Sequence, residues 1–212
     1  MNTIFVGPQG SGKGTQAKII AKELGYIHLS LGALFREEIE KDSEFGRLVD
    51  SYVEKGDLVP ADITNKLITE RVKKLNAEEK RAIIDGYPRE IEQAKFAKEN
   101  FEIDKVILIN VSEQEVIKRL NARYHCPKCK KEYNTLYESL KPKNDLTCDV
   151  CGTKLEQRED DSSIDAIKER LQIYHNQTIP VLELFKDKVI EINGEQPIER
   201  VTEEILEKFN SD

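Results

Sequence analysis

Residues 2–15 read NTIFVGPQGSGKGT, an apolar run followed by a glycine-rich segment that ends in lysine, glycine and threonine. The run at residues 2–6 is short, is rich in strand-forming residues and stops at Gly7, as a buried parallel strand does. From Lys13 to Leu24, apolar residues recur at helical spacing. A glycine-rich loop between a strand and a helix directs backbone N–H groups and the positive end of the helix dipole at an anion. This stretch therefore predicts a phosphate-binding loop.

The loop carries one charged residue, Lys13, which would place its charge on the β and γ phosphates of a nucleotide. Most loops of this kind have serine or threonine directly after the lysine. Here Gly14 stands in that place, and Thr15 and Gln16 follow it. This variant indicates one branch of the phosphate-loop proteins. The residues expected to contact nucleotide phosphates are Gly10, Ser11, Gly12, Lys13, Gly14 and Thr15.

Apolar runs and amphipathic stretches alternate along the rest of the chain. Strands are predicted at residues 2–6, 26–29, 82–85, 106–111 and 189–192. Helices are predicted at residues 13–24, 62–75, 91–99, 113–123, 165–185 and 198–209. Pro180 lies inside the fifth helix and should kink or split it. Five strands alternating with helices predict an α/β fold with a doubly wound parallel sheet, in which ligands bind beyond the carboxyl ends of the strands.

Length and charge narrow the class of protein. The chain has 212 residues, 38% of them hydrophobic, which suits a single domain (1–212) that carries inserted segments. Its 33 basic and 40 acidic residues give a formal charge of −7, which argues against a surface that broadly binds nucleic acid or anionic membrane. No apolar run approaches the roughly 20 residues of a membrane span. We expect a cytoplasmic protein.

Two segments interrupt the alternation of strands and helices. Residues 30–59 contain short polar helices separated by glycines, and residues 125–159 contain all four cysteines, many lysines and no helical period. Cys126 and Cys129 form one pair, and Cys148 and Cys151 form the other, with 18 residues between the pairs. This spacing predicts a structural zinc site with four thiolate ligands and no open position. Disulfides or an iron–sulfur cluster are the weaker alternatives for the same cysteines.

Six blocks of sequence resemble the adenylate kinase family, and together they span nearly the whole chain. They are the phosphate loop through Gln16; Leu29-Ser30-x-Gly32-x-Leu34-x-Arg36; Asp85-Gly86-Tyr87-Pro88-Arg89 with Gln93 after it; Arg119 with Arg123; Gln157-Arg158-x-Asp160-Asp161; and Arg170. The resemblance implies a P-loop kinase core, a helical lobe that binds the nucleoside monophosphate (30–59) and a zinc-ribbon-like lid (125–159). It implies phosphoryl transfer from ATP, with Mg²⁺, to AMP, giving two ADP.

The resemblance also implies which residues act. Arg36 and Arg89 would hold the phosphate of AMP, and Arg119 would stack on the ATP base. The implied catalytic residues are Lys13, Asp85, Arg89, Arg123, Arg158, Asp160, Asp161 and Arg170. The implied ATP-binding residues outside the loop are Arg119, Arg123, Tyr133 and Gln196. The implied monophosphate-binding residues are Leu31, Arg36, Asp57, Leu58, Val59, Gly86, Tyr87, Pro88, Arg89, Gln93, Arg158 and Arg170.

Two residues depart from the family pattern. Members usually have threonine where this chain has Leu31, and an acidic residue where it has Ala33. The threonine helps to recognise adenine, so its loss should relax selectivity for AMP. Gln93 still matches the residue that contacts the adenine edge, so AMP is the first choice of acceptor.

Two alternatives remain at this point. One is a kinase of UMP, CMP or several monophosphates. The other, from a different class, is a zinc-ribbon nucleic-acid-binding module on a nucleotide-switch core, which would leave the spaced arginines unexplained. The acidic surface suits a monomer, although a homo-oligomer is compatible with the same sequence.

Overall fold

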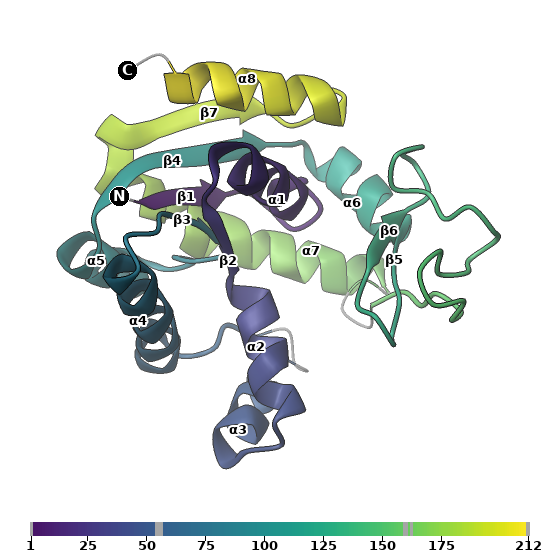
Figure 1. The fold of residues 1–212 in the computed structure, drawn as a ribbon, viewed down its shortest axis with the longest axis horizontal. Coiled ribbons are helices and arrows are strands. Elements are labelled where there is room, and N and C mark those ends of the chain that lie inside the picture. The colour runs from purple at the N-terminus through teal and green to yellow at the C-terminus, as the bar shows by residue number, and fades with distance from the viewer. Residues whose placement is uncertain (1, 54–56, 159–160, 162, 211–212) are drawn as a thin grey trace.

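Five parallel strands form the central sheet, in the order β2-β3-β1-β4-β7 (Figure 1). The structure is a computed structural model that describes residues 2–53, 57–158, 161 and 163–210. The strands are β1 (Asn2–Val6), β2 (Ile27–Ser30), β3 (Ala82–Asp85), β4 (Ile103–Asn110) and β7 (Val189–Asn193). The doubly wound sheet predicted from the sequence is therefore confirmed. Because β1 lies between β3 and β4, the loop that follows β1 emerges at the centre of the carboxyl edge, where such sheets bind ligands.

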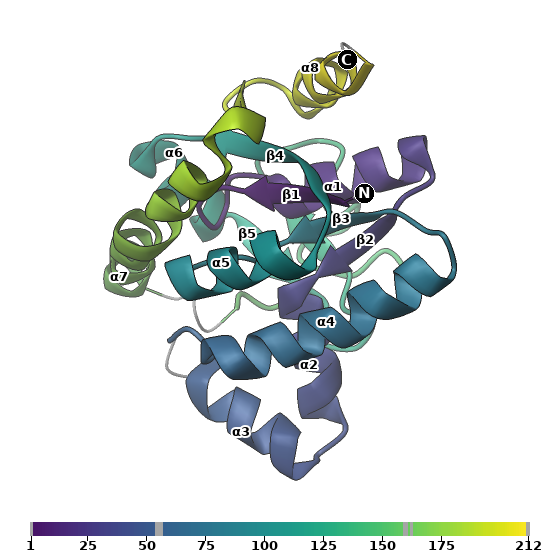
Figure 2. The same cartoon turned by 90° about the vertical axis from the view of Figure 1, so that its left-hand side faces the viewer.

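Helices cover both faces of the sheet. They are α1 (Lys13–Leu24), α2 (Leu31–Glu40), α3 (Glu44–Val53), α4 (Ala61–Ala77), α5 (Ile91–Asn100), α6 (Glu113–Asn121), α7 (Ile164–Ile173) and α8 (Ile198–Asn210). Alternate strand residues point to opposite faces. Ile4 and Ile84 pack with α4 and α5, whereas Phe5 and Ile83 pack with α1 and α8. Figure 2 shows α4 and α5 side by side on one side of the sheet.

The segment after α7 changes helix type. A π-helix (Tyr174–Thr178) follows α7 and is succeeded by a 3₁₀ segment (Ile179–Lys188) that contains Pro180. Proline has no N–H to donate, so regular α-helical bonding cannot continue through this position. The predicted helix 165–185 is thus divided near Pro180. The 3₁₀ segment is itself interrupted at Phe185, whose φ of −124° is not helical.

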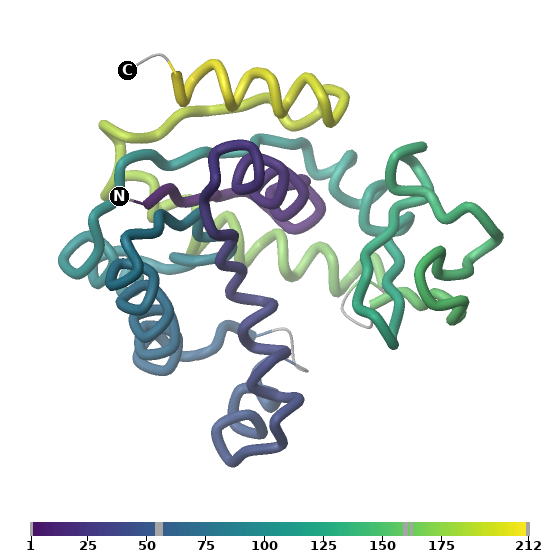
Figure 3. The backbone as a smooth tube through the Cα atoms, viewed as in Figure 1, coloured from purple at the N-terminus to yellow at the C-terminus, as the bar shows by residue number. Residues whose placement is uncertain are grey.

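Two excursions leave the sheet, and the tube in Figure 3 follows both. The first is the α2–α3 segment, and the second contains the antiparallel pair β5 (Arg123–His125) and β6 (Glu132–Asn134). The predicted helix 113–123 was too long, because α6 ends at Asn121 and Arg123 pairs with Asn134 as the start of β5. Among the described residues, no helix combines the length and apolarity needed to cross a bilayer.

Candidate active site

A cleft of about 990 Å³ opens at the carboxyl edge of the sheet, and the phosphate loop forms its floor. Lys13 begins α1 and donates a hydrogen bond from Nζ to the carbonyl oxygen of Pro8, 3.0 Å away. Seven arginines from several parts of the sequence also line this cleft: Arg71 and the six that the resemblance singled out, Arg36, Arg89, Arg119, Arg123, Arg158 and Arg170. The described structure therefore brings Lys13 and all six singled-out arginines to one cavity.

The charge on Lys13 is poorly solvated. Burial, together with the positive charges of Arg89, Arg123 and Arg170, lowers its pKa to about 8, although Asp85 opposes the shift. Cations held this close repel one another unless anions lie between them. The cleft is therefore suited to a polyanion such as a nucleotide phosphate chain.

Asp85 ends β3 beside the phosphate loop and is 8% exposed. Burial by itself would raise the pKa of Asp85, but the hydrogen bond with His28 and the charges of Lys13 and Arg89 outweigh burial and lower it. The His28 Nε2 lies 3.4 Å from Asp85 Oδ2, while Oδ1 is buried without a hydrogen-bond partner. A buried, ionised carboxylate oxygen with unused acceptor capacity fits a water of a bound Mg²⁺. A Cβ at Gly14 would lie 3.3 Å from Oδ2, so glycine leaves room on this side of the carboxylate.

Asp161 pairs with two of the arginines. Its side chain is fully buried; Oδ2 accepts a hydrogen bond from Arg123 Nε at 2.7 Å, and Oδ1 accepts one from Arg170 Nη1 at 3.2 Å. A buried carboxylate between two guanidinium groups fixes their directions. Asp161 thus holds both guanidinium groups in place. Asp160 lies outside the described residues, and a catalytic role of either aspartate stays a prediction.

Arg89 is held against its own turn. Its Nε donates to the Gly86 carbonyl oxygen at 2.8 Å, and a Cβ at Gly86, whose φ is +80°, would lie 3.0 Å from Nη2. The positive φ favours glycine at this position, and a Cβ there would press on the Arg89 guanidinium. Arg158 pairs with Glu132 of β6.

Arg119 lines the cleft, and its guanidinium is held by several partners. Its side chain is 8% exposed and donates to the carbonyl oxygens of Ser11 (3.2 Å) and Gly194 (2.8 Å), while Nε pairs with Glu115 at 2.9 Å. Its guanidinium also lies 5.6 Å from the centre of the Tyr137 ring. Arg119 therefore ties the phosphate loop to the turn after β7. Its stacking on the ATP base stays a prediction.

The remaining implied residues divide into two groups. Tyr133 and Gln196 line the large cleft, and Gly86, Pro88, Leu58 and Arg89 line an adjoining cavity of about 80 Å³ that Lys13 and Arg170 also reach. Others contact neither cavity: Leu31, Val59 and Tyr87 are buried, and Asp57 is exposed. Their implied contacts with a monophosphate stay predictions.

The Gln93 side chain is 2% exposed, and its bonds go to its own turn. Its Oε1 accepts from the Arg89 N–H at 2.9 Å, and its Nε2 donates to Glu90 at 3.0 Å. Tyr87, one residue before the cis proline Pro88, donates its hydroxyl to Asn65. In this conformation Gln93 positions Arg89, and contact with an adenine edge stays a prediction.

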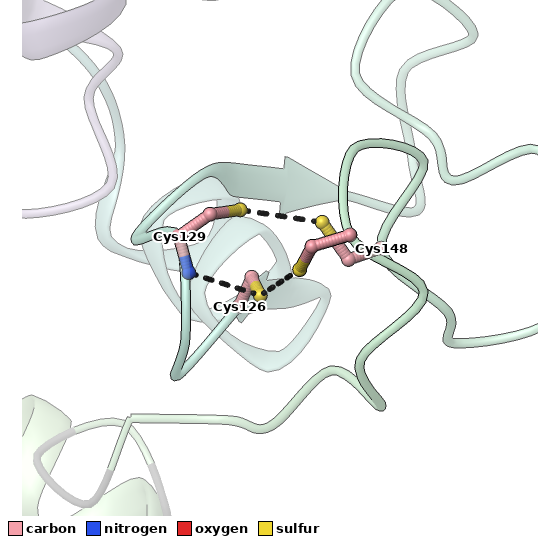
Figure 4. Close-up of side chains that lie close together, drawn as sticks. Cys126, Cys129 and Cys148 are labelled. Carbon is pink, nitrogen blue, oxygen red and sulfur yellow. Dashed lines mark hydrogen bonds between the residues drawn. The ribbon is translucent and has the colours of Figure 1, made fainter.

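The four cysteines form two turns of the same design, and Figure 4 shows three of their side chains converging. In each turn the residue four positions after the first cysteine has positive φ and donates its N–H to that cysteine's carbonyl: Lys130 to Cys126 and Gly152 to Cys148. All four Sγ atoms lie within 4.8 Å of one another, and two pairs are separated by 3.4 Å. Disulfide sulfurs would be about 2 Å apart.

These distances suit a metal site. Tetrahedral zinc with bonds of about 2.3 Å needs sulfurs roughly 3.8 Å apart. Burial opposes ionisation of Cys148, but hydrogen bonds from the Tyr133 hydroxyl and from the N–H groups of Val150 and Cys151 lower its pKa to about 6, so that a thiolate forms readily. The four-cysteine cluster is thus compatible with zinc and has no position left for a substrate.

Sequence reasoning missed His28, Tyr137 and Gly194. His28 lies on β2 directly beside β3 and contacts Asp85, but no motif in the sequence contains it. Gly194 follows the last strand of the sheet, and this position could have marked it as a site residue, since ligands bind beyond the carboxyl ends of the strands in such sheets. No signal in the sequence pointed to Tyr137, because its contact with Arg119 depends on how the second excursion packs.

Comparisons with known proteins agree with this site. A sequence model of the family described as "Adenylate kinase" matches residues 5–190. The adenylate kinase of Petrotoga mobilis is 43% identical over 99% of both chains, and that of Kosmotoga olearia is 41% identical over the full length of both. The adenylate kinase of Archaeoglobus fulgidus is 38% identical, again over the full length of both. The chain therefore belongs to the adenylate kinase family of phosphate-transferring enzymes.

Proposed function

We propose that this enzyme transfers the terminal phosphoryl group of ATP, as its Mg²⁺ complex, to AMP, reversibly giving two ADP. The observation that carries the proposal is the convergence of Lys13 and the six singled-out arginines on one cleft at the end of β1. The names of the relatives support the choice of substrates. Balancing adenine nucleotides in the cytoplasm, as a monomer, is the cellular role that fits this activity.

Transfer between two phosphates needs little proton chemistry, because the attacking oxygen is already ionised. Catalysis then depends on alignment and on neutralising charge. Lys13 and the loop N–H groups would hold the donor phosphates, and Arg36 and Arg89 would hold the acceptor phosphate. Arg123 and Arg170, fixed by Asp161, would neutralise the group in transit. Arg158 would join them from the β6 side of the cleft.

Asp85 and the loop are the residues that would hold Mg²⁺ through its waters. The ion supplies charge neutralisation across the donor phosphates when bound. His28 keeps the Asp85 carboxylate oriented, with Oδ1 left for that contact.

We also propose that residues 30–59 and 125–159 act as the two moving parts, the monophosphate lobe and the lid. Closure over the cleft would exclude water, which otherwise competes as the phosphoryl acceptor. The zinc would be structural, because the lid's own apolar cluster of Cys126, Tyr133, Cys148 and Leu155 is small.

A panel of acceptors tests the substrate assignment. With MgATP as donor, AMP should give a kcat/KM well above those of CMP, UMP and GMP. The position of Leu31 favours one alternative, a broader acceptor range, because this buried side chain offers no hydrogen bond to a base. Leu31→Thr should then raise the preference for AMP, by up to about tenfold for one added hydrogen bond. AMP turnover no faster than that of CMP or UMP would overturn the assignment.

Metal analysis tests the lid. Purified protein should contain about one zinc per chain, and Cys148→Ser should lower both zinc content and thermal stability. A folded, active enzyme without bound metal would contradict the zinc assignment.

A further inference from the structure

Tyr133 lies between the four-cysteine cluster and the cleft. Its side chain is 2% exposed, and it contributes to the lining of the cleft. The hydroxyl donates to Cys148 Sγ at 3.3 Å and accepts from the Asp149 N–H at 2.8 Å. One side chain therefore contacts both a metal ligand and the nucleotide site.

The next residue continues this connection. Asn134 donates from Nδ2 to the Arg119 carbonyl oxygen at 3.0 Å, and it pairs across the β5–β6 sheet with Arg123. Arg119 in turn donates its guanidinium to the carbonyl oxygen of Ser11 in the phosphate loop. Mostly buried hydrogen bonds thus join the Cys148 sulfur to β6, β6 to Arg119 and Arg119 to the loop, and the covalent structure of β6 and of Arg119 connects one bond to the next.

We propose that Tyr133 is a positioning residue that couples metal binding at the four cysteines to ATP binding at the phosphate loop. A bound metal holds Cys148 as a fixed thiolate, which is the stronger acceptor for the Tyr133 hydroxyl. That bond sets the position of β6, and β6 sets the position of Arg119. The inference rests on the proposed function insofar as ATP occupies the Arg119 side of the cleft.

Metal binding at the cysteines should change the affinity for ATP and leave the affinity for AMP unchanged. The series of bonds ends at Ser11, which belongs to the loop proposed to hold the donor. Arg36 lies on α2 and Arg89 follows β3, and none of these hydrogen bonds involves either element. A lid that was merely stabilised by zinc would show no such difference between the two nucleotides.

The first experiment measures metal affinity without nucleotide. Zinc affinity is determined by chelator competition for wild type, Tyr133→Phe and Tyr124→Phe. Tyr124 lies directly opposite Tyr133 in the β5–β6 pair, so it is a matched control for the loss of one hydroxyl. Tyr133→Phe should weaken zinc binding about tenfold or more, as loss of a partner of a metal ligand does. Equal affinities for the two variants would overturn the proposal.

The second experiment measures dissociation constants of MgATP and AMP by calorimetry, with zinc-loaded and metal-free protein. In wild type, zinc removal should weaken ATP binding about fivefold or more and leave AMP binding nearly unchanged. Asn134→Ala, which removes the bond to Arg119 and leaves the cysteines intact, should keep wild-type zinc affinity and lose the zinc dependence of ATP binding.

Two results would count against the coupling. One is an equal effect of zinc removal on ATP and AMP, since general unfolding weakens both. Another is a zinc effect on ATP that survives in both Tyr133→Phe and Asn134→Ala. Failure of zinc-loaded wild type to bind ATP would instead overturn the proposed function, while the nucleotide-free zinc affinities would still report on the Tyr133 contact.

Discussion

At the scale of single residues, the site is organised by buried charges that face one another. Asp161 pairs with Arg123 and Arg170, and Asp85 lies close enough to Lys13 for each charge to shift the pKa of the other. Isolated buried charges are costly, and a charge whose partner is removed costs several kcal/mol. The cluster retains an excess of positive charge around Lys13, and that excess is what a bound phosphate chain would neutralise.

The lowered pKa of Lys13 predicts a pH dependence. In the free enzyme Lys13 loses its proton as pH rises through about 8, so kcat/KM for ATP should fall above that pH. Bound phosphates raise the pKa again, so kcat should stay level to higher pH. Initial rates from about pH 6.5 to 10 measure both parameters. Lys13→Arg, which stays charged, should be slower but show no fall near pH 8; the same fall in that variant would contradict the assignment.

The lowered pKa of Lys13 also affects the stability of the fold. Its contribution to the free energy of unfolding should rise with pH, whereas kcat/KM should fall. The unfolded chain holds the Lys13 proton up to about its ordinary pKa of 10.5, whereas the folded chain releases it near 8. Because the unfolded state binds more protons between these values, this residue's contribution to the free energy of unfolding rises with pH across that window.

At the scale of elements, the first excursion depends on close packing between α2 and α3. Gly46 of α3 lies against α2, so that a Cβ added there would sit 2.3 Å from the Glu38 carbonyl oxygen. Backbone atoms cannot move aside as the end of a side chain can, so α2 and α3 depend on glycine at this contact. Arg36 lies on α2, and the packing of the two helices therefore bears on the acceptor phosphate site.

Gly46→Ala tests this packing. We expect it to lower the free energy of unfolding by about 1–3 kcal/mol, because the two helices must separate. The KM for AMP should rise more than the KM for ATP, since α2 carries Arg36. Ser51→Ala, a small exposed change on the same helix, is the control and should alter neither quantity. Thermal melts and initial rates measure the outcome; equal melting temperatures for the two variants would contradict the packing argument.

At the scale of the whole molecule, an ion pair within the described part of the chain joins the two excursions. Lys130, in the first cysteine turn, lies 3.2 Å from Glu40, which ends α2. Both side chains are more than half exposed, so the pair contributes little to the stability of the fold. It links the first cysteine turn to the end of α2, however, and so bears on how the two segments approach each other.

Glu40→Gln should loosen that approach without unfolding the protein. A surface pair of this kind shifts an equilibrium by at most about fivefold, so the KM values should rise by no more than that while the melting temperature stays unchanged. The effect should disappear at high salt, because the pair is screened. Glu138→Gln, in an exposed pair with Lys141, is a matched control. A lower melting temperature for Glu40→Gln would show that the pair acts within the fold.

The whole molecule also explains how a chain with net charge −7 binds anions. Net charge describes the surface as a whole, and it disfavours broad binding of nucleic acid. Lys13 and the six arginines occupy one cleft, where their field is focused. The net negative charge acts over the whole surface, whereas the positive field acts only within the cleft, so an acidic protein can still bind an anion there.

The amino-acid sequence by itself determined the sheet, the phosphate loop and the cysteine turns. Each depends on a short-range pattern: an apolar run before Gly7, helical spacing from Lys13, or two residues between Cys126 and Cys129. Such patterns reflect backbone geometry within a few residues, so they can be recognised without knowing which distant residues pack against them.

Only the tertiary structure decided which groups meet. His28 and Asp85 are 57 positions apart and touch because β2 and β3 are neighbours. α6 stops at Asn121 because Arg123 pairs with β6, and Arg119 turns to carbonyl oxygens 108 and 75 positions away. These contacts depend on how packed elements align across the fold, a long-range outcome that no local window of sequence contains.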